Sequence, residues 1–366
     1  MRRPLSKLRP FGPFVGNDYG AQSQSVLPTD GDGNVKAEDI EIYFQDSKNM
    51  TQINQGQASL AITSPPYNVD YAYSNIGDNK PRPQYMADMA SIFHEVYNKL
   101  MPSGRLCLNV PHMQRTEGGL ADNIPATSDF IQMLSGERMF MPNIEKDETE
   151  QERLGSFQDK TVSAESIEDA DNPYDLRPIK RLYEDTNFSL SELIIWHKGN
   201  SASLAPPGSL GEDNQTYNFP LQLNHEAIIV FQKPGSRPRT EDYKKEQSKL
   251  EKSWWTRPYH EKNNNDDFNR QFNTTRRSTV WNIETTSSVD VDGGKVQPFP
   301  SEIPERLIES YSYVDDLVID PFAGVGTTLK AAIDKNRRAI GYEKNEKLKP
   351  EIEGTLGMNI ENTTDI

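Results

Sequence analysis

Apolar residues recur at helical spacing or in short unbroken runs along much of the chain, and these patterns predict its elements. Within 84–101, Met89, Ile92, Phe93 and Val96 follow the i, i+3, i+4, i+7 order of an amphipathic helix. Short apolar runs predict strands at 39–46, 60–63, 105–110, 191–198, 225–233, 316–322 and 337–345, and helical patterns recur at 176–187, 300–313 and 323–336. Because strands alternate with helices, we expect an α/β fold with a largely parallel sheet that binds ligands at the carboxyl ends of its strands.

In three segments the apolar residues follow no sustained helical or strand spacing. Residues 1–37 are rich in Pro, Gly, Ser, Gln and Asn, which predicts a poorly ordered N-terminal arm. Residues 112–175 are predicted to be an insertion, and their acidic part, 142–175, holds eleven acids and three bases. Residues 234–282 mix basic and aromatic side chains. Only 34% of the chain is hydrophobic, as expected for a core that carries long polar loops.

The composition excludes several classes of protein. No run of 18 apolar residues exists, so no membrane span is expected, and the basic N-terminus lacks the apolar segment of a secretory signal. A single cysteine, Cys107, rules out a disulfide framework and a cysteine-based zinc site. The five histidines are scattered without metal-ligand spacing, so no metal is expected. We therefore expect a soluble protein of a reducing compartment, the cytoplasm.

The net charge of −15 argues against a nucleic-acid partner, because neutralising phosphates requires Lys and Arg. The charge is unevenly distributed, however, since residues 142–175 carry −8 and residues 233–281 carry +5. A local basic face is therefore compatible with the acidic total.

A strand, a glycine turn and a helix are predicted around the segment DPFAGVGTT (320–328). Gly324 and Gly326 permit a sharp turn and the close approach of a ligand to the backbone. A dinucleotide fingerprint requires a third glycine where this chain has Leu329, so a pyrophosphate site is not favoured. Glu343 ends the next strand, where a carboxylate can accept both hydroxyls of a ribose. Together these residues favour an adenosyl-binding site over a purely structural turn.

A second motif, TSPPY (63–67), follows the strand at 60–63. Two adjacent prolines cannot continue the pairing of a sheet, so a rigid loop must follow the strand. Alone, the motif is more typical of a proline-stiffened turn with an aromatic plug. In a chain that also carries the glycine turn, a functional role is favoured.

TSPPY followed much later by DPFAGVGTT resembles the S-adenosylmethionine-dependent amino-methyltransferases that modify exocyclic amines of DNA bases. The resemblance extends over 39–110 and 176–345 and includes IIWHKGN, HEAIIVF and FPSEIPERLI in the order of that family. It implies S-adenosylmethionine as cofactor, double-stranded DNA as substrate, no membrane, and a Rossmann-like, doubly wound sheet. It leaves open a separately encoded cognate restriction endonuclease and the oligomeric state.

The catalytic motif precedes the cofactor turn, as in the circularly permuted class called beta. The sequence ends soon after Glu343, so the remaining cofactor strand is expected at 39–47, with Asp46 at its tip near the adenine. Residues 39 and 345 should then lie on neighbouring parts of one sheet, and residues 38–366 should form one methyltransferase domain. The cofactor-binding residues that the resemblance implies are Asp46, Asp320, Phe322, Ala323, Gly324, Gly326, Thr327, Thr328 and Glu343.

The resemblance also implies that Ser64, Pro65, Pro66 and Tyr67 form the catalytic loop. The lone pair of an exocyclic amine is delocalised into the ring of the base. Two acceptors, Ser64 Oγ and the Pro65 carbonyl, would orient the amine for attack on the methyl group. The prolines would hold that carbonyl in place, and Tyr67 would stack on a base flipped out of the duplex.

The sequence also indicates which atom of the base is methylated. Methylation of carbon 5 of cytosine would need a thiolate, but Cys107 lies in a strand expected to be buried. In the family, Ser before the two prolines is more often seen with cytosine and Asp with adenine, so Ser64 favours N4 of cytosine over N6 of adenine. A catalytically idle DNA-binding module of the same fold is a further alternative, which the intact loop and glycine turn disfavour.

In the beta order, the region that recognises the target lies between the catalytic and cofactor halves, here at 234–282. Its Lys and Arg would contact phosphates, its polar side chains base edges, and its aromatic side chains would act as wedges. A solvated basic loop is the alternative, and the acidic segment 142–175 is expected to lie away from the duplex. The candidate DNA-binding residues are Arg237, Arg239, Trp254, Trp255, Arg257, Arg276 and Arg277.

Overall fold

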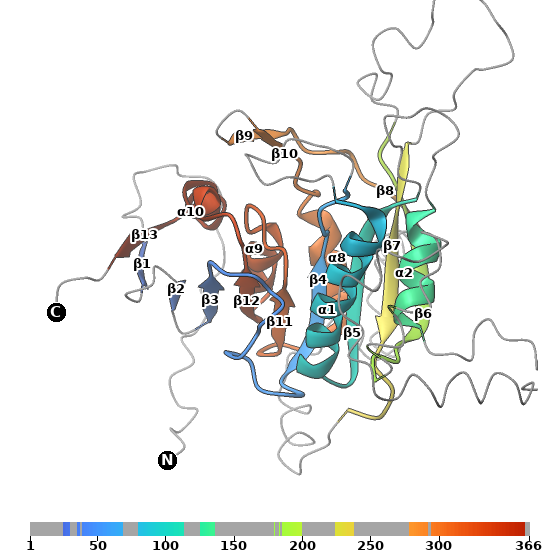
Figure 1. The fold of residues 1–366 in the computed structure, drawn as a ribbon. Helices are drawn as coiled ribbons and strands as arrows, with labels where there is room; N and C mark the ends of the chain where they lie inside the picture. Colours follow the sequence, from blue (N-terminus) through green and yellow to red (C-terminus); the bar gives the residue numbers. More distant parts are fainter. Residues whose placement is uncertain are drawn as a thin grey trace, which may run out of the picture.

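The computed structural model describes residues 25–29, 35–36, 39–68, 80–112, 125–135, 179, 183, 185–199, 224–237, 278–291 and 294–362 of the chain. Eleven strands form one sheet in the order β13-β1-β2-β3-β12-β11-β4-β5-β7-β6-β8, and the strands from β13 to β6 run from left to right in Figure 1. All of these strands except β2 and β7 run in the same direction. The expected α/β fold with a mostly parallel sheet is therefore confirmed.

The elements follow the chain in this order. The strands of the large sheet are β1 (Ser25–Thr29), β2 (Val35–Lys36), β3 (Ile40–Tyr43), β4 (Ala58–Thr63), β5 (Leu100–Pro111), β6 (Ser189–His197), β7 (His225–Gln232), β8 (Val280–Asn282), β11 (Leu317–Asp320), β12 (Arg338–Tyr342) and β13 (Met358–Asn362). A separate hairpin pairs β9 (Val289–Val291) with β10 (Gly294–Val296). The helices are α1 (Arg82–Lys99), α2 (Ala126–Leu134), α8 (Glu302–Tyr311), α9 (Thr327–Asp334), α10 (Lys349–Leu356) and the short 3₁₀ helix η4 (Glu346–Leu348).

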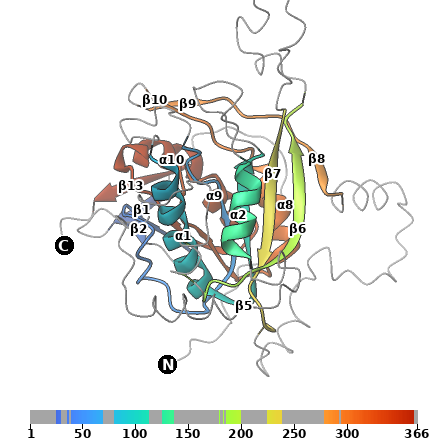
Figure 2. The same cartoon turned by 45° about the vertical axis from the view of Figure 1, so that its right-hand side comes forward.

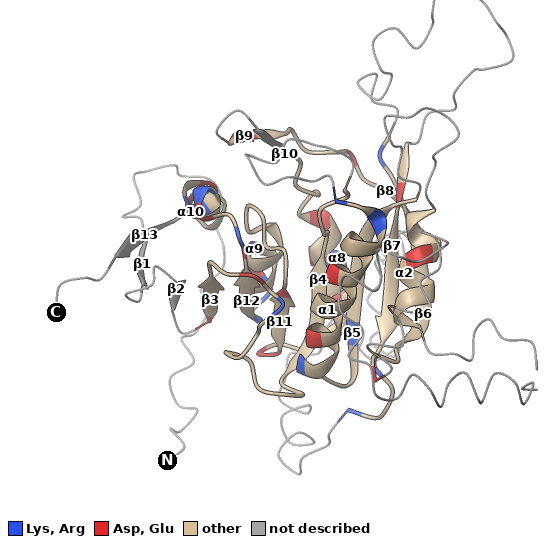
Figure 3. Cartoon of the chain, viewed as in Figure 1, with Lys and Arg blue, Asp and Glu red and all other residues tan. Residues whose placement is uncertain are grey.

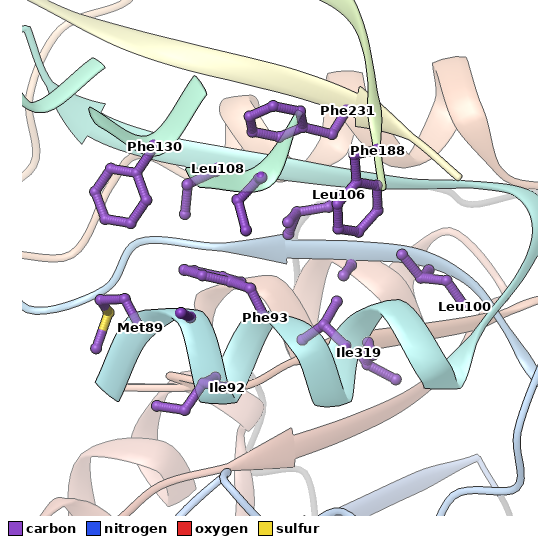
Figure 4. Close-up of a cluster of buried hydrophobic side chains, with 14 of the residues drawn as sticks. Met89, Ile92, Phe93, Leu100, Leu106, Leu108, Phe130, Phe188, Phe231 and Ile319 are labelled. Carbon is purple, nitrogen blue, oxygen red and sulfur yellow. The ribbon is translucent and has the colours of Figure 1, made fainter. Parts of the chain in front are cut away.

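Helices cover both faces of the sheet, so the central strands are buried on both sides (Figures 1 and 2). Figure 4 shows Phe93 of α1 and Phe130 of α2 packed against Leu106 and Leu108 of β5. Cys107, between these two leucines, belongs to the cluster on the opposite face, beneath α8, α9 and α10. Successive side chains of a strand point to opposite faces, so one strand supplies both cores. Among the described residues, none of the helices is both long enough and apolar enough to span a membrane.

Strands from the two ends of the sequence lie side by side, as the permuted motif order predicted. β3 pairs with β12 in parallel, with Ile40 opposite Ala339 and Tyr43 opposite Tyr342. The rings of Tyr43 and Tyr342 stack with their centroids 5.5 Å apart. The strand expected at 39–47 therefore lies next to the strand that leads to Glu343.

The structure contains elements that the sequence patterns did not predict. Strands β1 and β2 fall within the expected N-terminal arm, and α10 and β13 follow Glu343, where no further strand was expected. Helix α2 lies within the expected insertion at 112–175, so the prediction that this segment lacks regular structure was wrong for residues 126–134. These elements are short, and a short element shows too few repeats of a period to be recognised. The acidic segment 142–175 and most of the predicted helix 176–187 lie outside the described residues.

Strand β5 begins earlier than predicted. The Pro102-Ser103-Gly104 segment, expected to be a break before a strand at 105, is part of β5. The pairing with β4 shifts there, from Ala58 opposite Leu100 to Leu60 opposite Arg105. This irregularity in the pairing contains Ser103, which has a positive φ of 66°.

Candidate active site

The two sequence motifs meet at the carboxyl edge of neighbouring strands. Thr63 ends β4 and Asp320 ends β11, and these strands pair in parallel. The Thr63 hydroxyl donates to Asp320 Oδ1 at 2.6 Å, and the Phe322 amide donates to the same oxygen at 3.0 Å. Burial raises the pKa of Asp320 to about 6, although both hydrogen bonds act in the opposite direction. A single buried carboxyl group thus connects the TSPPY loop to the glycine turn.

The turn between β11 and α9 uses backbone conformations that favour glycine. Gly324 has φ of 54° and Gly326, which caps α9, has φ of 86°. Among the described residues, a Cβ placed on Gly324 would contact only the Phe322 carbonyl, at 3.9 Å, so no other described atom fills the space beside this turn. A Cβ on Gly341 would instead lie 2.7 Å from Leu329, so Gly341 is required for packing of α9 on β12. Of the other expected turn residues, Ala323 and Thr328 are buried, and Thr327 begins α9.

Glu343 follows β12 and is held against the same turn. Its Oε2 accepts the Gly324 amide at 2.9 Å, and its Oε1 accepts the Asn345 amide at 2.8 Å. Burial raises the pKa of Glu343 to about 7, against the lowering effect of these two amides. Each carboxylate oxygen has capacity for a further hydrogen bond, so the group can still accept two hydroxyls. The open turn and this carboxylate fit the adenosyl group that the sequence predicted.

Asp46 lies in the loop after β3, close to the residue that follows Glu343. Its carboxylate accepts the Lys48 amide at 3.0 Å and pairs with the Lys344 ammonium at 3.2 Å. Partial burial would raise its pKa, but the Lys48 amide and Lys344 outweigh that effect and lower it. Asp46 therefore follows β3 as expected and contacts the residue after Glu343.

The Ser64–Tyr67 loop is anchored at two points. Tyr85 of α1 donates its hydroxyl to the Pro66 carbonyl at 2.9 Å. The Tyr67 hydroxyl lies 3.1 Å from Ser64 Oγ and donates to Glu226 Oε2 at 3.0 Å. The loop is thus fixed to the helix before β5 and to the start of β7.

Three residues that sequence reasoning did not assign complete this cluster. Asn109 of β5 donates its Nδ2 to the Tyr67 hydroxyl at 3.0 Å and to Glu226 Oε2 at 2.8 Å. Lys198, just after β6, forms an ion pair with Glu226 Oε1. Glu226 is only 7% exposed, and a buried acid at the start of the apolar strand HEAIIVF is the signal that could have identified it.

Three of the scattered histidines also meet at this edge. The rings of His112 and His225 have centroids 5.4 Å apart, and His197 lies opposite His225 in the β6–β7 ladder. Burial and the neighbouring His112, His197 and Lys198 lower the pKa of His225, which favours its neutral form. Among the described residues, no cluster of His, Cys, Asp and Glu side chains could hold a metal ion.

Arg237 does not join this cluster. It follows β7 at the opposite edge of the sheet, where its guanidinium pairs with both oxygens of Asp316 and lies 4.7 Å from the centre of the Tyr313 ring. Its predicted contact with DNA is therefore not supported by its position. The other candidate DNA-binding residues lie outside the described residues: Arg239, Trp254, Trp255, Arg257, Arg276 and Arg277. Figure 3 shows Lys and Arg interspersed with Asp and Glu over the described elements.

The fold is that of a DNA methylase. The model of the DNA methylase family that comprises N6 and N4 methyltransferases matches residues 58–354. The chain belongs to this N6/N4 family, and it is an S-adenosylmethionine-dependent DNA methyltransferase, which confirms the family and the cofactor predicted from the sequence.

Relatives of known name cover most of the chain. Type II methyltransferase M.MjaI of Methanocaldococcus jannaschii is 25% identical over 347 residues, which are 87% of this chain and 91% of that protein. Type II methyltransferase M.MthZI of Methanothermobacter thermautotrophicus is 24% identical over 351 residues, 89% of this chain and 78% of that protein. The crystal structure of TTHA0409 from Thermus thermophilus, described as a DNA modification methylase, matches with a TM-score of 0.50 and 21% identity over 86% of this chain and 93% of that one. This last match supports the fold.

Proposed function

We propose that this enzyme methylates the exocyclic N4 of a cytosine that is flipped out of duplex DNA. In this proposal, Ser64 Oγ and the Pro65 carbonyl accept hydrogen bonds from the amine, and Tyr67 stacks on the base. Pro66 keeps the loop rigid, helped by the bond between its carbonyl and Tyr85. The Ser before the two prolines supports cytosine over adenine as the target.

One observation carries the proposal, the 2.6 Å hydrogen bond between Thr63 and Asp320. It fixes the residue before Ser64 to the strand end that opens the glycine turn. A base held by the TSPPY loop and an adenosyl group held by the turn would therefore meet at one edge of the sheet. Positioning of two reactants in this way is a major source of rate enhancement.

The only cysteine supports transfer to nitrogen. Cys107 is fully buried within β5, and burial strongly raises the pKa of its thiol. A thiol that stays protonated cannot act as the covalent nucleophile that methylation of carbon 5 needs. Direct attack by the amine requires no such group.

The cofactor would be held by the residues around the turn. Gly324 would allow close approach to the backbone, Glu343 would accept the ribose hydroxyls, and Asp46 would lie near the adenine. S-adenosylmethionine supplies an electrophilic methyl group when bound. The remaining turn residues would shape this site: Asp320, Phe322, Ala323, Gly326, Thr327 and Thr328.

We further propose that residues 38–366 form a single methyltransferase domain that recognises its DNA site through 234–282. The presence of β3, β4, β11 and β12 in one sheet supports a single domain. The local charge of +5 over 233–281 supports a role for this region in phosphate binding. A separately encoded restriction endonuclease is the partner expected from the type II relatives.

Mass spectrometry tests the target atom. DNA of mixed sequence is incubated with the enzyme and S-adenosylmethionine, digested to nucleosides and compared with untreated DNA. The expected product is N4-methyl-2′-deoxycytidine. Detection of N6-methyladenine instead would show that the target is adenine. If the digest contained no methylated nucleoside, the proposed function would be contradicted.

The raised pKa of Glu343 predicts that cofactor affinity increases with pH. The carboxylate must be ionised to accept two ribose hydroxyls, and its pKa in the free protein is about 7. The dissociation constant is therefore expected to be about tenfold larger at pH 6 than at pH 8. Isothermal titration at both values measures it. Glu343→Gln is the control, because it removes this titration and leaves that of the cofactor itself. Equal pH dependence in the two proteins would contradict the role of Glu343.

A further inference from the structure

We propose that Glu226 is a positioning residue that sets the direction of the hydrogen bond made by Ser64. This inference rests on the proposed role of Ser64 as an acceptor for the amine of the target base. A serine hydroxyl can either donate or accept, so its chemistry at this position depends on where its own proton points. The surroundings of Tyr67 determine that direction.

The two oxygens of Glu226 are used differently. Oε1 pairs with the Lys198 ammonium, whereas Oε2 faces the Tyr67 hydroxyl and the Asn109 amide nitrogen. A carboxylate only accepts hydrogen bonds, so the Tyr67 proton must point toward Glu226. The tyrosine oxygen can then only accept, and it lies 3.0 Å from Asn109 Nδ2 and 3.1 Å from Ser64 Oγ.

Glu226 therefore fixes the direction in which the Tyr67 hydroxyl donates, and Tyr67 in turn fixes the direction in which the Ser64 hydroxyl donates. With its proton directed at Tyr67, Ser64 presents its lone pairs to the base, which is the arrangement that an amine donor requires. Lys198 and Asn109 hold the carboxylate in place, and the 7% exposure of Glu226 limits competition from water. Hydrogen bonds in such buried chains polarise one another.

The variant Glu226→Gln should reverse the donor and acceptor roles in this series of hydrogen bonds, because glutamine has nearly the same shape as glutamate but carries a donor. Lys198 can only donate, so the glutamine oxygen must face Lys198 and its NH₂ group must face Tyr67. Tyr67 would then accept from the glutamine and donate to Ser64. Ser64 would in turn direct its proton at the amine of the base and repel it. Asn109 directs its Nδ2 at Glu226 Oε2, so in the variant its amide must rotate to turn Oδ1, which has no hydrogen-bond partner in the described structure, toward the new NH₂ group.

The experiment compares Glu226→Gln, Tyr67→Phe and the double variant in methyl transfer under single-turnover conditions. Glu226→Gln is expected to lower the rate about 100-fold, with cofactor and DNA dissociation constants within about twofold of wild type. Tyr67→Phe breaks the chain without reversing it, so a smaller loss, about tenfold, is expected. Tyr67→Phe already removes the hydroxyl that connects Glu226 to Ser64. Adding Glu226→Gln to Tyr67→Phe should therefore lower the rate of methyl transfer little further.

A binding measurement supplies a second readout. Once the methylated site is mapped, duplexes with either the natural target base or its analogue without the amine are compared in the presence of S-adenosylhomocysteine. Wild type should prefer the amine, whereas Glu226→Gln should prefer the analogue. The control is Asp129→Asn, which alters a carboxylate that is also 7% exposed and is paired with Arg82. It should leave both the rate and the preference unchanged.

The outcomes separate this inference from the proposed function. An active wild type whose rate and base preference survive Glu226→Gln would overturn the role of Glu226 alone. Equal losses from Glu226→Gln in the presence and absence of the Tyr67 hydroxyl would also overturn it, because the effect would then not pass through Tyr67. A wild type that methylates no DNA would contradict the proposed function instead.

Discussion

Replacing Gly324 with leucine is expected to abolish S-adenosylmethionine binding, with a loss of affinity of at least about 100-fold, which corresponds to roughly 2.7 kcal/mol. Of the residues that the structure describes, the Cβ of the new side chain would meet only the Phe322 carbonyl, at 3.9 Å, so the leucine would extend into the space beside the turn. This is the space that the proposed function assigns to the cofactor. Isothermal titration of the variant with S-adenosylmethionine measures the loss.

A second glycine provides the control for this experiment. Leucine at position 324 must also adopt φ of 54°, a left-handed conformation that costs roughly 1–2 kcal/mol of stability. Gly56 has φ of 69°, and a Cβ there would contact no atom of the described part of the chain within 4 Å. Gly56→Leu therefore imposes the same backbone cost at the opposite edge of the sheet and should leave cofactor affinity intact. If Gly324→Leu binds as tightly as Gly56→Leu, the turn does not hold the cofactor.

Ser64→Ala is expected to lower the rate of methyl transfer by a factor of roughly 10²–10³, the usual effect of losing one preorganised hydrogen-bonding group. Cofactor affinity should be unchanged, because Ser64 lies on the TSPPY loop and not on the glycine turn. A single-turnover assay with labelled cofactor measures the rate, and titration calorimetry measures the affinity.

Another serine, within β4, serves as the control. Ser59 is 2% exposed and donates its hydroxyl to the Leu317 carbonyl at 3.2 Å. Ser59→Ala should lower the thermal unfolding temperature slightly, because a buried acceptor loses its partner, but should retain the rate. A Ser64→Ala variant that is as active as Ser59→Ala would exclude Ser64 from the reaction.

Much of the central sheet could be predicted because its strands carry strong local signals. The strand before Asp320 is an unbroken apolar run, and the glycines after it require a turn. The pairing of β3 with β12 was predicted from the order of the two motifs, which placed the remaining cofactor strand at 39–47. The positions of Ser64, Asp320 and Glu343 at one edge then follow from the parallel direction of β4, β11 and β12.

The cluster around Glu226 could not be predicted in the same way. Glu226 lies 159 residues from Tyr67 in the sequence, and β7 runs antiparallel to β5, so the start of β7 lies beside the end of β5. No period or spacing reveals such a convergence. Arg237 shows a related limit of sequence reasoning, because its charge was counted with that of its neighbours in sequence, whereas its partner Asp316 lies 79 residues away.

The sheet order also constrains how the protein can form during its synthesis. β11 and β12 lie between β3 and β4, although β3 and β4 are made first and are separated by only fourteen residues, 44–57. A growing chain on the ribosome therefore carries two strands whose facing edges stay unpaired until residues 317–342 emerge. Unpaired strand edges invite association with other chains, and long-range pairing is slow. These unpaired edges persist for most of the translation time, and under the proposed function the cofactor site is complete only once Glu343 has left the exit tunnel.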